Sequence, residues 1–175
     1  VEDSAGELAR LQNVRPLKNS TGAAPGNGGA LHITGAGTVE VVNSTVAENS
    51  ATAEGGGLWN SAVGTLRVSS TTLNKNLTTN SGAGVGAAAQ GGGALFNDGG
   101  QLTVSNSTVT GNLANNGNGG GLLNAAGTST VVNVTVFMND SSGLTNATGT
   151  VNLANSIVAA NGADCVGPMT TNGAP

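Results

Sequence analysis

The sequence predicts an all-β fold, a right-handed parallel β-helix of about five coils. Three observations support this prediction: an internal repeat, glycine or asparagine at fixed places in each repeat, and small residues where a core would use aromatic ones. The chain has 175 residues, of which 30 are glycine and 2% are aromatic. Such a composition favours a fold held by backbone hydrogen bonds and stacked small side chains.

The repeat begins with a glycine-rich triplet and a leucine, and it closes with an apolar residue followed three positions later by asparagine. The leading leucines are Leu31, Leu58, Leu95, Leu122 and Leu144, and the later apolar residues are Val46, Leu73, Val109, Val136 and Val158. The distance between these two positions is nearly constant, and length varies only between the last asparagine and the next glycines. A closed coil of about 22 residues with loops inserted at one corner explains this pattern.

Gly and Asn tolerate the positive φ of a sharp corner, so three short strands and three corners are expected in each coil. Asparagines at equivalent corners can hydrogen-bond from coil to coil and satisfy buried amides. We therefore expect an asparagine ladder formed by Asn49, Asn76, Asn112, Asn139 and Asn161. The right hand follows from the usual preference of parallel connections.

The chain divides into residues 1–27, which lack the repeat, the β-helix repeats of residues 28–166, and a tail of residues 167–175. A capping-box spacing at Ser4–Glu7 and apolar residues at Leu8, Leu11 and Val14 favour a short amphipathic helix as a cap. The alternative is a strand that completes a partial first coil. The segment after Asn161 is too polar and too short to cap the other end well.

Charged residues are only 8% of the chain, and the net charge is −4. This excludes a basic surface for nucleic acid, a coiled coil and an ordinary acidic tail. No run of 18 apolar residues occurs, so we expect no membrane span.

The units GGGLWN…GTLRVSSTTLNKN and GGALFN…GQLTVSNSTVTGN resemble those of bacterial secreted right-handed β-helix repeat proteins. The tail Asn155–Cys165 resembles the NSI-x-AxN…DC terminal coil of those surface-anchor-type families. The GGA[IL] units have a looser similarity to polymorphic outer-membrane adhesins. The resemblance implies a secreted chain. In the terminal motif of these families the cysteine often pairs with a second one further on, and this sequence lacks that second cysteine.

The titratable residues do not form an expected catalytic or metal site. His32 is the only histidine, and the acids fall in different positions of the repeat. Only Glu40 and Arg67 share a position on adjacent coils, which predicts an exposed ion pair. We therefore expect no enzyme, no metal and no cofactor.

Three further features are candidates for contact or modification. The first is a column of His32, Trp59, Phe96 and Leu123, interpreted either as a structural stack on the outer face or as a surface stripe for sugar or a partner. The second is the set of Asn-x-Ser/Thr sites, of which Asn19, Asn76 and Asn139 are the candidate glycosylation acceptors, while the Asn43, Asn106 and Asn133 column is expected to be inward or laddered. The third is Cys165, either a free buried thiol or half of an interchain disulfide.

These features predict a non-catalytic structural or adhesive β-solenoid that stacks end to end into a surface filament. The alternative is a carbohydrate-active β-helix, either lyase-like or sugar-binding, with cell-surface polysaccharide as partner. Because the chain starts at Val1 and contains no signal peptide, we expect an exported chain from which that peptide was removed, located outside the cell or at its surface.

Overall fold

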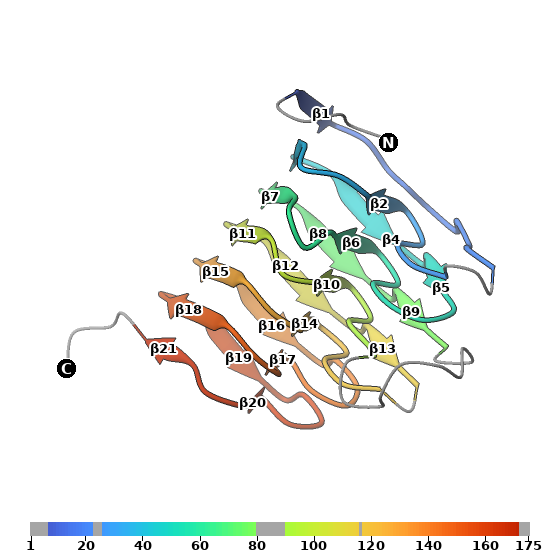
Figure 1. Cartoon of the computed structure of the whole chain (residues 1–175). Helices are drawn as coiled ribbons and strands as arrows, with labels where there is room; N and C mark the ends of the chain where they lie inside the picture. The colour runs from blue at the N-terminus through green and yellow to red at the C-terminus, as the bar shows by residue number, and fades with distance from the viewer. Residues whose placement is uncertain (1–6, 23–25, 80–89, 116, 172–175) are drawn as a thin grey trace.

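The structure, a computed structural model, describes residues 7–22, 26–79, 90–115 and 117–171. All regular elements in these ranges are β-strands, and every strand pairing is parallel. Strands stack in chain order from β1 at one end to β20 and β21 at the other, as Figure 1 shows. The predicted parallel β-helix is confirmed.

The coils contribute to four sheets, one more than the sequence predicted. The first sheet has seven strands in the order β1 (Leu8–Gln12), β3 (Thr38–Val42), β7 (Thr65–Ser69), β11 (Gln101–Ser105), β15 (Thr128–Val132), β18 (Thr150–Ala154) and β21 (Thr170–Thr171). The second sheet has six strands in the order β2 (Leu31–Ile33), β6 (Leu58–Asn60), β10 (Leu95–Asn97), β14 (Leu122–Asn124), β17 (Leu144–Asn146) and β20 (Cys165–Val166).

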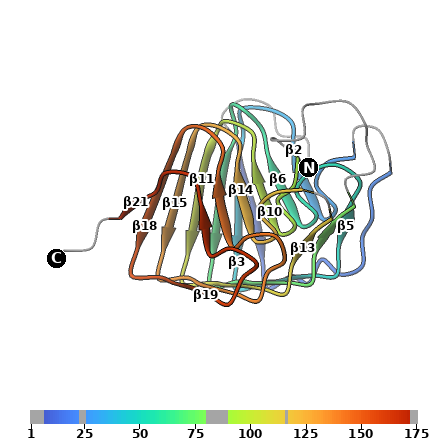
Figure 2. The same cartoon turned by 90° about the horizontal axis from the view of Figure 1, so that it is seen from below.

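The third and fourth sheets are shorter. The third has five strands in the order β19 (Ile157–Ala159), β16 (Thr135–Phe137), β12 (Thr108–Thr110), β8 (Thr72–Asn74) and β4 (Thr45–Ala47). The fourth has three strands in the order β13 (Leu113–Ala114), β9 (Leu77–Thr78) and β5 (Ser50–Ala51). Figure 2 shows the strands of successive coils running side by side along the stack.

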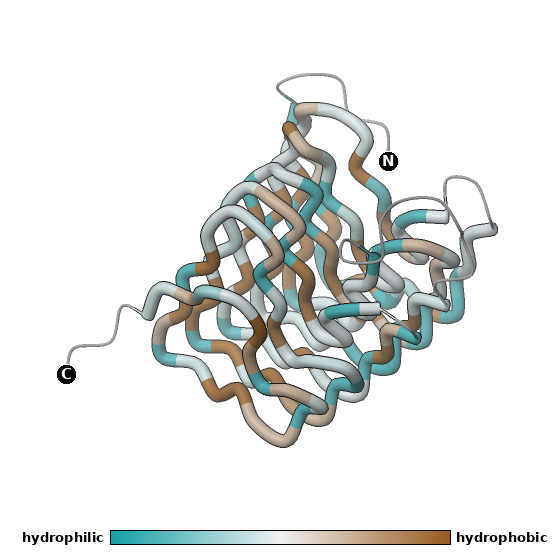
Figure 3. The backbone as a smooth tube through the Cα atoms, turned by 60° about the horizontal axis from the view of Figure 1, so that its bottom comes forward, coloured by the Kyte–Doolittle hydropathy of each residue, from teal (hydrophilic) through white to brown (hydrophobic). Residues whose placement is uncertain are grey.

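The core consists of aliphatic side chains that stack in register inside the coil. The five predicted leucines pair in sequence along the second sheet, and Val46, Leu73, Val109, Val136 and Val158 do the same along the third. Along β3, β7, β11 and β15 of the first sheet buried and more exposed residues alternate, because successive side chains point to opposite faces. Figure 3 shows brown hydrophobic stretches interspersed with white and teal ones along the stacked coils.

Glycine is required where the backbones of consecutive coils approach each other. A Cβ on Gly93 would lie 2.4 Å from the carbonyl oxygen of Gly120 and 2.6 Å from that of Leu113. A Cβ on Gly56 would lie 2.4 Å from the carbonyl oxygens of Gly93 and Leu77, and a Cβ on Gly120 would clash with that of Asp140. The glycines predicted to open each repeat therefore allow the close approach of the backbones at this corner.

The predicted asparagine ladder is confirmed, and it is longer than expected. Each asparagine from Asn49 to Asn139 donates its side-chain N–H to the Oδ1 of the asparagine one coil further on, at 2.9 Å from Asn76 to Asn112 and again from Asn112 to Asn139. Asn19 adds a member at the N-terminal end, because its Nδ2 lies 2.8 Å from the Oδ1 of Asn49.

A second buried ladder connects the last residues of the strands in the second sheet. Its members are Asn60, Asn97, Asn124 and Asn146. The first coil carries Ile33 at this position, and the Oδ1 of Asn60 has no hydrogen-bond partner.

The predicted N-terminal helix is wrong, and the alternative of a partial coil is correct for the described residues. Leu8–Gln12 forms strand β1, which pairs with β3, and Leu17 and Ser20 form bridges to the next coil. Ala9 and Leu11 pack against the core, so the apolar residues that suggested a helical face serve a strand instead. The capping-box residues Ser4–Gly6 lie outside the described residues.

Candidate functional site

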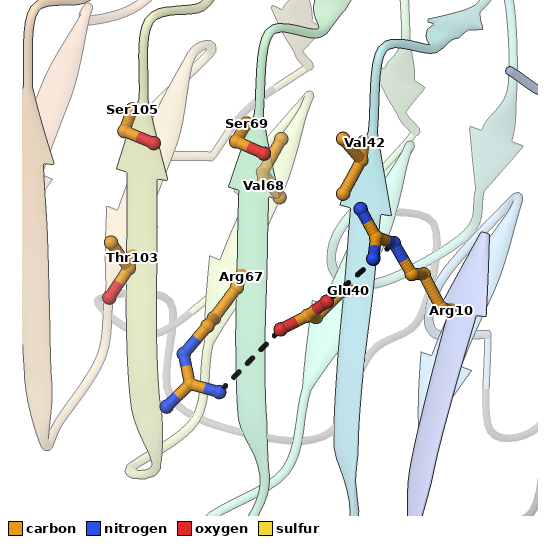
Figure 4. Close-up of a pocket in the computed structure, with 8 residues that line it drawn as sticks. All are labelled: Arg10, Glu40, Val42, Arg67, Val68, Ser69, Thr103 and Ser105. Atoms are coloured by element: carbon orange, nitrogen blue, oxygen red, sulfur yellow. Dashed lines mark ion pairs between the residues drawn. The ribbon is translucent and has the colours of Figure 1, made fainter. Parts of the chain in front are cut away.

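An ion-pair cluster lies on the outer face of the first sheet. Arg10, Glu40 and Arg67 occupy equivalent positions on the adjacent strands β1, β3 and β7. The Nε of Arg10 is 3.8 Å from Oε2 of Glu40, and Nη1 of Arg67 is 3.9 Å from Oε1 (Figure 4). The predicted pair of Glu40 and Arg67 is confirmed, and Arg10 joins it because β1 is a strand.

This cluster borders a shallow depression of about 210 Å³ on the same face. Its lining residues are Arg10, Glu40, Val42, Arg67, Val68, Ser69, Thr103 and Ser105. Two guanidinium groups face a single carboxylate there, so one positive charge is in excess beside three hydroxyl groups. Such a surface can bind an anionic group through charge-assisted hydrogen bonds.

Hydrolysis of a glycoside would need two carboxylates about 5–10 Å apart in one cleft. Glu40 is the one carboxylate among the described residues that line the depression. The chain's single histidine, His32, lies in β2 of another sheet. The depression therefore offers groups for binding, and the described residues add no second acid to it.

The column of His32, Trp59, Phe96 and Leu123 is in register, but it is not an open contact stripe. Trp59 is 9% exposed, Phe96 1% and Leu123 0%, and these three form an apolar cluster separate from the main core. The corner glycine before the strand approaches the column closely, since a Cβ on Gly92 would be 3.0 Å from the Cβ of Phe96. The stripe prediction is therefore wrong for these three residues, and the stacking interpretation fits their burial.

Aromatic contacts within this column have defined geometry. The ring of His32 meets Trp59 edge-on with centroids 4.4 Å apart, and Trp59 lies parallel to Phe96 at 6.4 Å. Burial lowers the pKa of His32 below its ordinary value, which favours the neutral ring against Trp59.

Glu54 accepts a hydrogen bond from the indole N–H of Trp59, at 2.9 Å from Nε1 to Oε2. Burial raises the pKa of Glu54, the Trp59 hydrogen bond opposes this, and the nearby charge of Asp98 adds to it. The carboxylate thus fixes the orientation of the indole ring at the edge of the column.

Two of the three candidate glycosylation sites lie in the buried ladder. Asn76 and Asn139 are buried, 0% and 2% exposed, and their amide groups donate within the ladder. Asn19 is exposed, but its amide also donates to Asn49. Asn43, Asn106 and Asn133, expected to be inward or laddered, are exposed at a corner and not inward. The laddered alternative fits them, because side-chain hydrogen bonds join Asn43 to Asn13 and Asn133 to Asn106.

Cys165 is exposed in β20, so the expectation of a buried thiol is wrong. Partial desolvation and the charge of Asp164 raise the pKa of this thiol, which lowers the fraction of thiolate at neutral pH.

The two ends of the stack carry most of the exposed large hydrophobic side chains that the structure describes. Leu8 and Leu17, 60% and 40% exposed, lie at the N-terminal end, and Ile157 and Val166, 63% and 42% exposed, lie at the C-terminal end. The basic residues are confined to the first half of the chain: Arg10, Arg15 and Lys18 lie in the first partial coil, where Arg10 pairs with Glu40 and Lys18 with Glu48, and no Lys or Arg follows Lys75 in the sequence.

In the described ranges no group of three His, Cys, Asp or Glu residues is arranged to hold a metal ion. No helix in these ranges has the length and apolar character needed to cross a bilayer. Neither a family model, nor a curated protein, nor a solved structure matches this chain.

Proposed function

We propose that this chain is a non-catalytic structural β-solenoid that associates head to tail into a filament outside the cell, where it serves an adhesive or scaffolding role. The observation that carries this proposal is the pair of open ends of the stack. Sheet edges with free N–H and C=O groups are templates for another strand, and a head-to-tail contact that does not close generates a filament.

Strand β19 is the edge strand of the third sheet at the C-terminal end. Ile157 donates its N–H to Val134 of the preceding coil at 2.9 Å. Because successive residues of a parallel strand direct their N–H groups to opposite sides, Val158 directs its own toward the open side. The side chain of Val158 packs against the core, so its backbone is held in place for a further strand.

Val158→Pro tests this proposal, because it removes the open-side N–H without removing a hydrogen bond between β19 and β16. We expect this variant to be folded and to lose end-to-end association. Val158→Ala is the matched control, since it shortens the side chain and keeps the N–H, and it should still associate. Sedimentation velocity over a concentration series, with negative-stain microscopy, measures both. Equal association of the proline variant and the unmodified chain would refute stacking through this edge.

A second candidate function is the binding of an acidic polysaccharide, favoured by the excess guanidinium beside Glu40 and the hydroxyls of the depression. Titration with polygalacturonate tests it. Arg67→Gln should weaken binding severalfold, whereas Arg15→Gln, which changes an arginine that does not line the depression, should leave it unchanged. Equal effects of the two changes would show that the polysaccharide is bound by nonspecific charge attraction and not by the depression.

A further inference from the structure

The two ends of the stack have stepped profiles. At the N-terminal end the first and third sheets begin before the second, because β1 pairs with β3 and Leu17 bridges Ala47, while β2 is the edge strand of the second sheet. At the C-terminal end the second sheet extends one coil beyond the third, because β20 pairs with β17 while β19 is an edge strand.

These steps complement each other in all but one place. A second copy set in the same register would lay its residues 14–17 along β19 and its β2 along β20. Its β1 would then need the place beside β18, which β21 occupies through the pairs Asn152↔Thr170 and Leu153↔Thr171. Among the described elements, β21 is the one that stands where the next copy would continue the first sheet (Figure 1).

β1 is a more extensive partner for β18 than β21 is. β1 and β18 each have five residues, and β21 has two. In the register of the sheet, Ala9 and Leu11 of the second copy would cover Val151 and Leu153, which continue their own inner columns. The segment that ends in β21 contributes one partly buried apolar side chain to the core, Met169.

Asp164, like β21, occupies a place that a residue of the second copy would need. Asn139 donates its backbone and side-chain N–H groups to Oδ1 of Asn161, at 2.9 Å each. Asn161 donates the same two groups to Oδ1 of Asp164, at 3.1 and 3.2 Å. Asp164 thus supplies the oxygen that the next asparagine of the ladder would supply. In a second copy Asn19 heads the same ladder through its bond to Asn49.

We propose that Asp164 and β21 form a self-cap that a second copy of this chain displaces, with β1 of the incoming copy replacing β21 and Asn19 replacing Asp164. This inference rests on the proposed head-to-tail function and names its partner and its regulation. The cap protects the end of a single chain, and its short strand yields to the longer, better-packed one.

Two proline variants of β21 separate displacement from simple addition. In β3, β7, β11, β15 and β18 the first residue of the strand donates its backbone N–H to the preceding coil, as Thr128 does to Gly100 at 3.1 Å. Thr170 pairs with Asn152, the third residue of β18, and so takes the third position of this five-residue pattern. By alternation Thr170 directs its N–H toward β18, and Thr171 directs its own away. Thr170→Pro therefore loosens the cap, whereas Thr171→Pro leaves it paired.

We expect Thr170→Pro to lower the concentration at which the chain associates by about tenfold, since it removes backbone bonding that competes with the second copy. Thr171→Pro should associate like the unmodified chain. Met169→Ser, which weakens the apolar anchor of β21 without a proline, should act in the same direction as Thr170→Pro. Sedimentation velocity gives the concentrations, and circular dichroism checks that each variant is folded.

The outcomes distinguish this inference from the proposed function. If the chains associate but neither Thr170→Pro nor Met169→Ser promotes it, displacement is wrong and head-to-tail association stands. If Thr171→Pro impairs association, the second copy adds onto β21, which also overturns displacement. If no variant associates at any concentration, the proposed function fails and the inference fails with it. Val158→Pro combined with Thr170→Pro should abolish the gain, because the incoming copy would still need β19.

Discussion

Two of the asparagine columns of this β-helix, the main ladder through Asn112 and the corner column through Asn106, differ in depth. Asn112 in the buried ladder is 1% exposed, and its side chain donates to Leu73 and Thr110 and exchanges hydrogen bonds with the asparagines before and after it. Asn106 in the corner column is exposed, and its side chain accepts one bond, from Asn133 at 3.2 Å. The same residue type thus satisfies buried backbone groups in one column and allows a positive φ of 48° in the other.

The largest expected effect is the loss of a buried asparagine. Asn112→Ala leaves the buried backbone N–H of Asn76 without its partner and removes the side-chain hydrogen bonds to the carbonyls of Leu73 and Thr110, the latter of which still accepts from the N–H of Lys75. An orphaned buried group costs about 1–3 kcal/mol and each further lost hydrogen bond about 1 kcal/mol, so we expect a loss of about 3–5 kcal/mol in the free energy of unfolding.

Asn106→Ala is the matched control for this loss. Alanine is strained at the positive φ of the corner, and we expect a cost of about 1–2 kcal/mol. Urea denaturation of both variants measures the difference. Similar losses in the free energy of unfolding of the two variants would show that burial of the asparagine does not determine its contribution to stability.

A smaller effect is expected where the second ladder stops short. Ile33→Asn would place a donor next to the unpaired Oδ1 of Asn60, and this gain offsets part of the lost apolar contact. Val41→Asn, in an equally buried position without an orphaned acceptor, should cost about 3 kcal/mol or more. We expect the Ile33 variant to be more stable than the Val41 variant by at least about 1 kcal/mol. The reverse order would show that packing at Ile33 outweighs the ladder.

The smallest effect on stability is expected for Glu54, whose side chain is partly buried and accepts the hydrogen bond from Trp59. Its pKa is raised in the folded state, so folding favours the protonated form. The stability associated with this group is present below the unfolded-state pKa and is lost as the pH rises through the folded-state pKa. Glu54→Gln keeps an oxygen for the Trp59 hydrogen bond and should flatten this part of the stability profile. Thermal unfolding between pH 4 and pH 8 measures it, and an unchanged profile would exclude Glu54 as its source.

Sequence periodicity predicted the coil, the stacked aliphatic columns, the main ladder and the ion pair of Glu40 with Arg67. These features repeat from coil to coil, so their spacing carries the information. Features at the ends of the stack could not be predicted in the same way. Arg10 and Asn19 belong to the cluster and the ladder because residues 8–21 form a partial coil, but their segment lacks the repeat that would have revealed it.

The second corner of each coil could not be predicted either. Glu48, Met138 and Ala160 adopt a positive φ there, although none of them is glycine or asparagine. The closed coil imposes this conformation on whatever residue falls at the corner, because the strands on both sides are held by their pairing with neighbouring coils. Local preference is overruled by the tertiary hydrogen bonds.

The sequence by itself determined that the chain winds into stacked coils, because a period near 22 residues with small apolar positions leaves few other ways to bury them. Only the tertiary structure decided which side chains are accessible. It buried Trp59, Phe96 and Leu123 in a cluster apart from the main core, and it brought Asn43, Asn106 and Asn133 to the surface. It also set the steps at the two ends, since a strand edge is defined by the neighbour it lacks and not by its own residues.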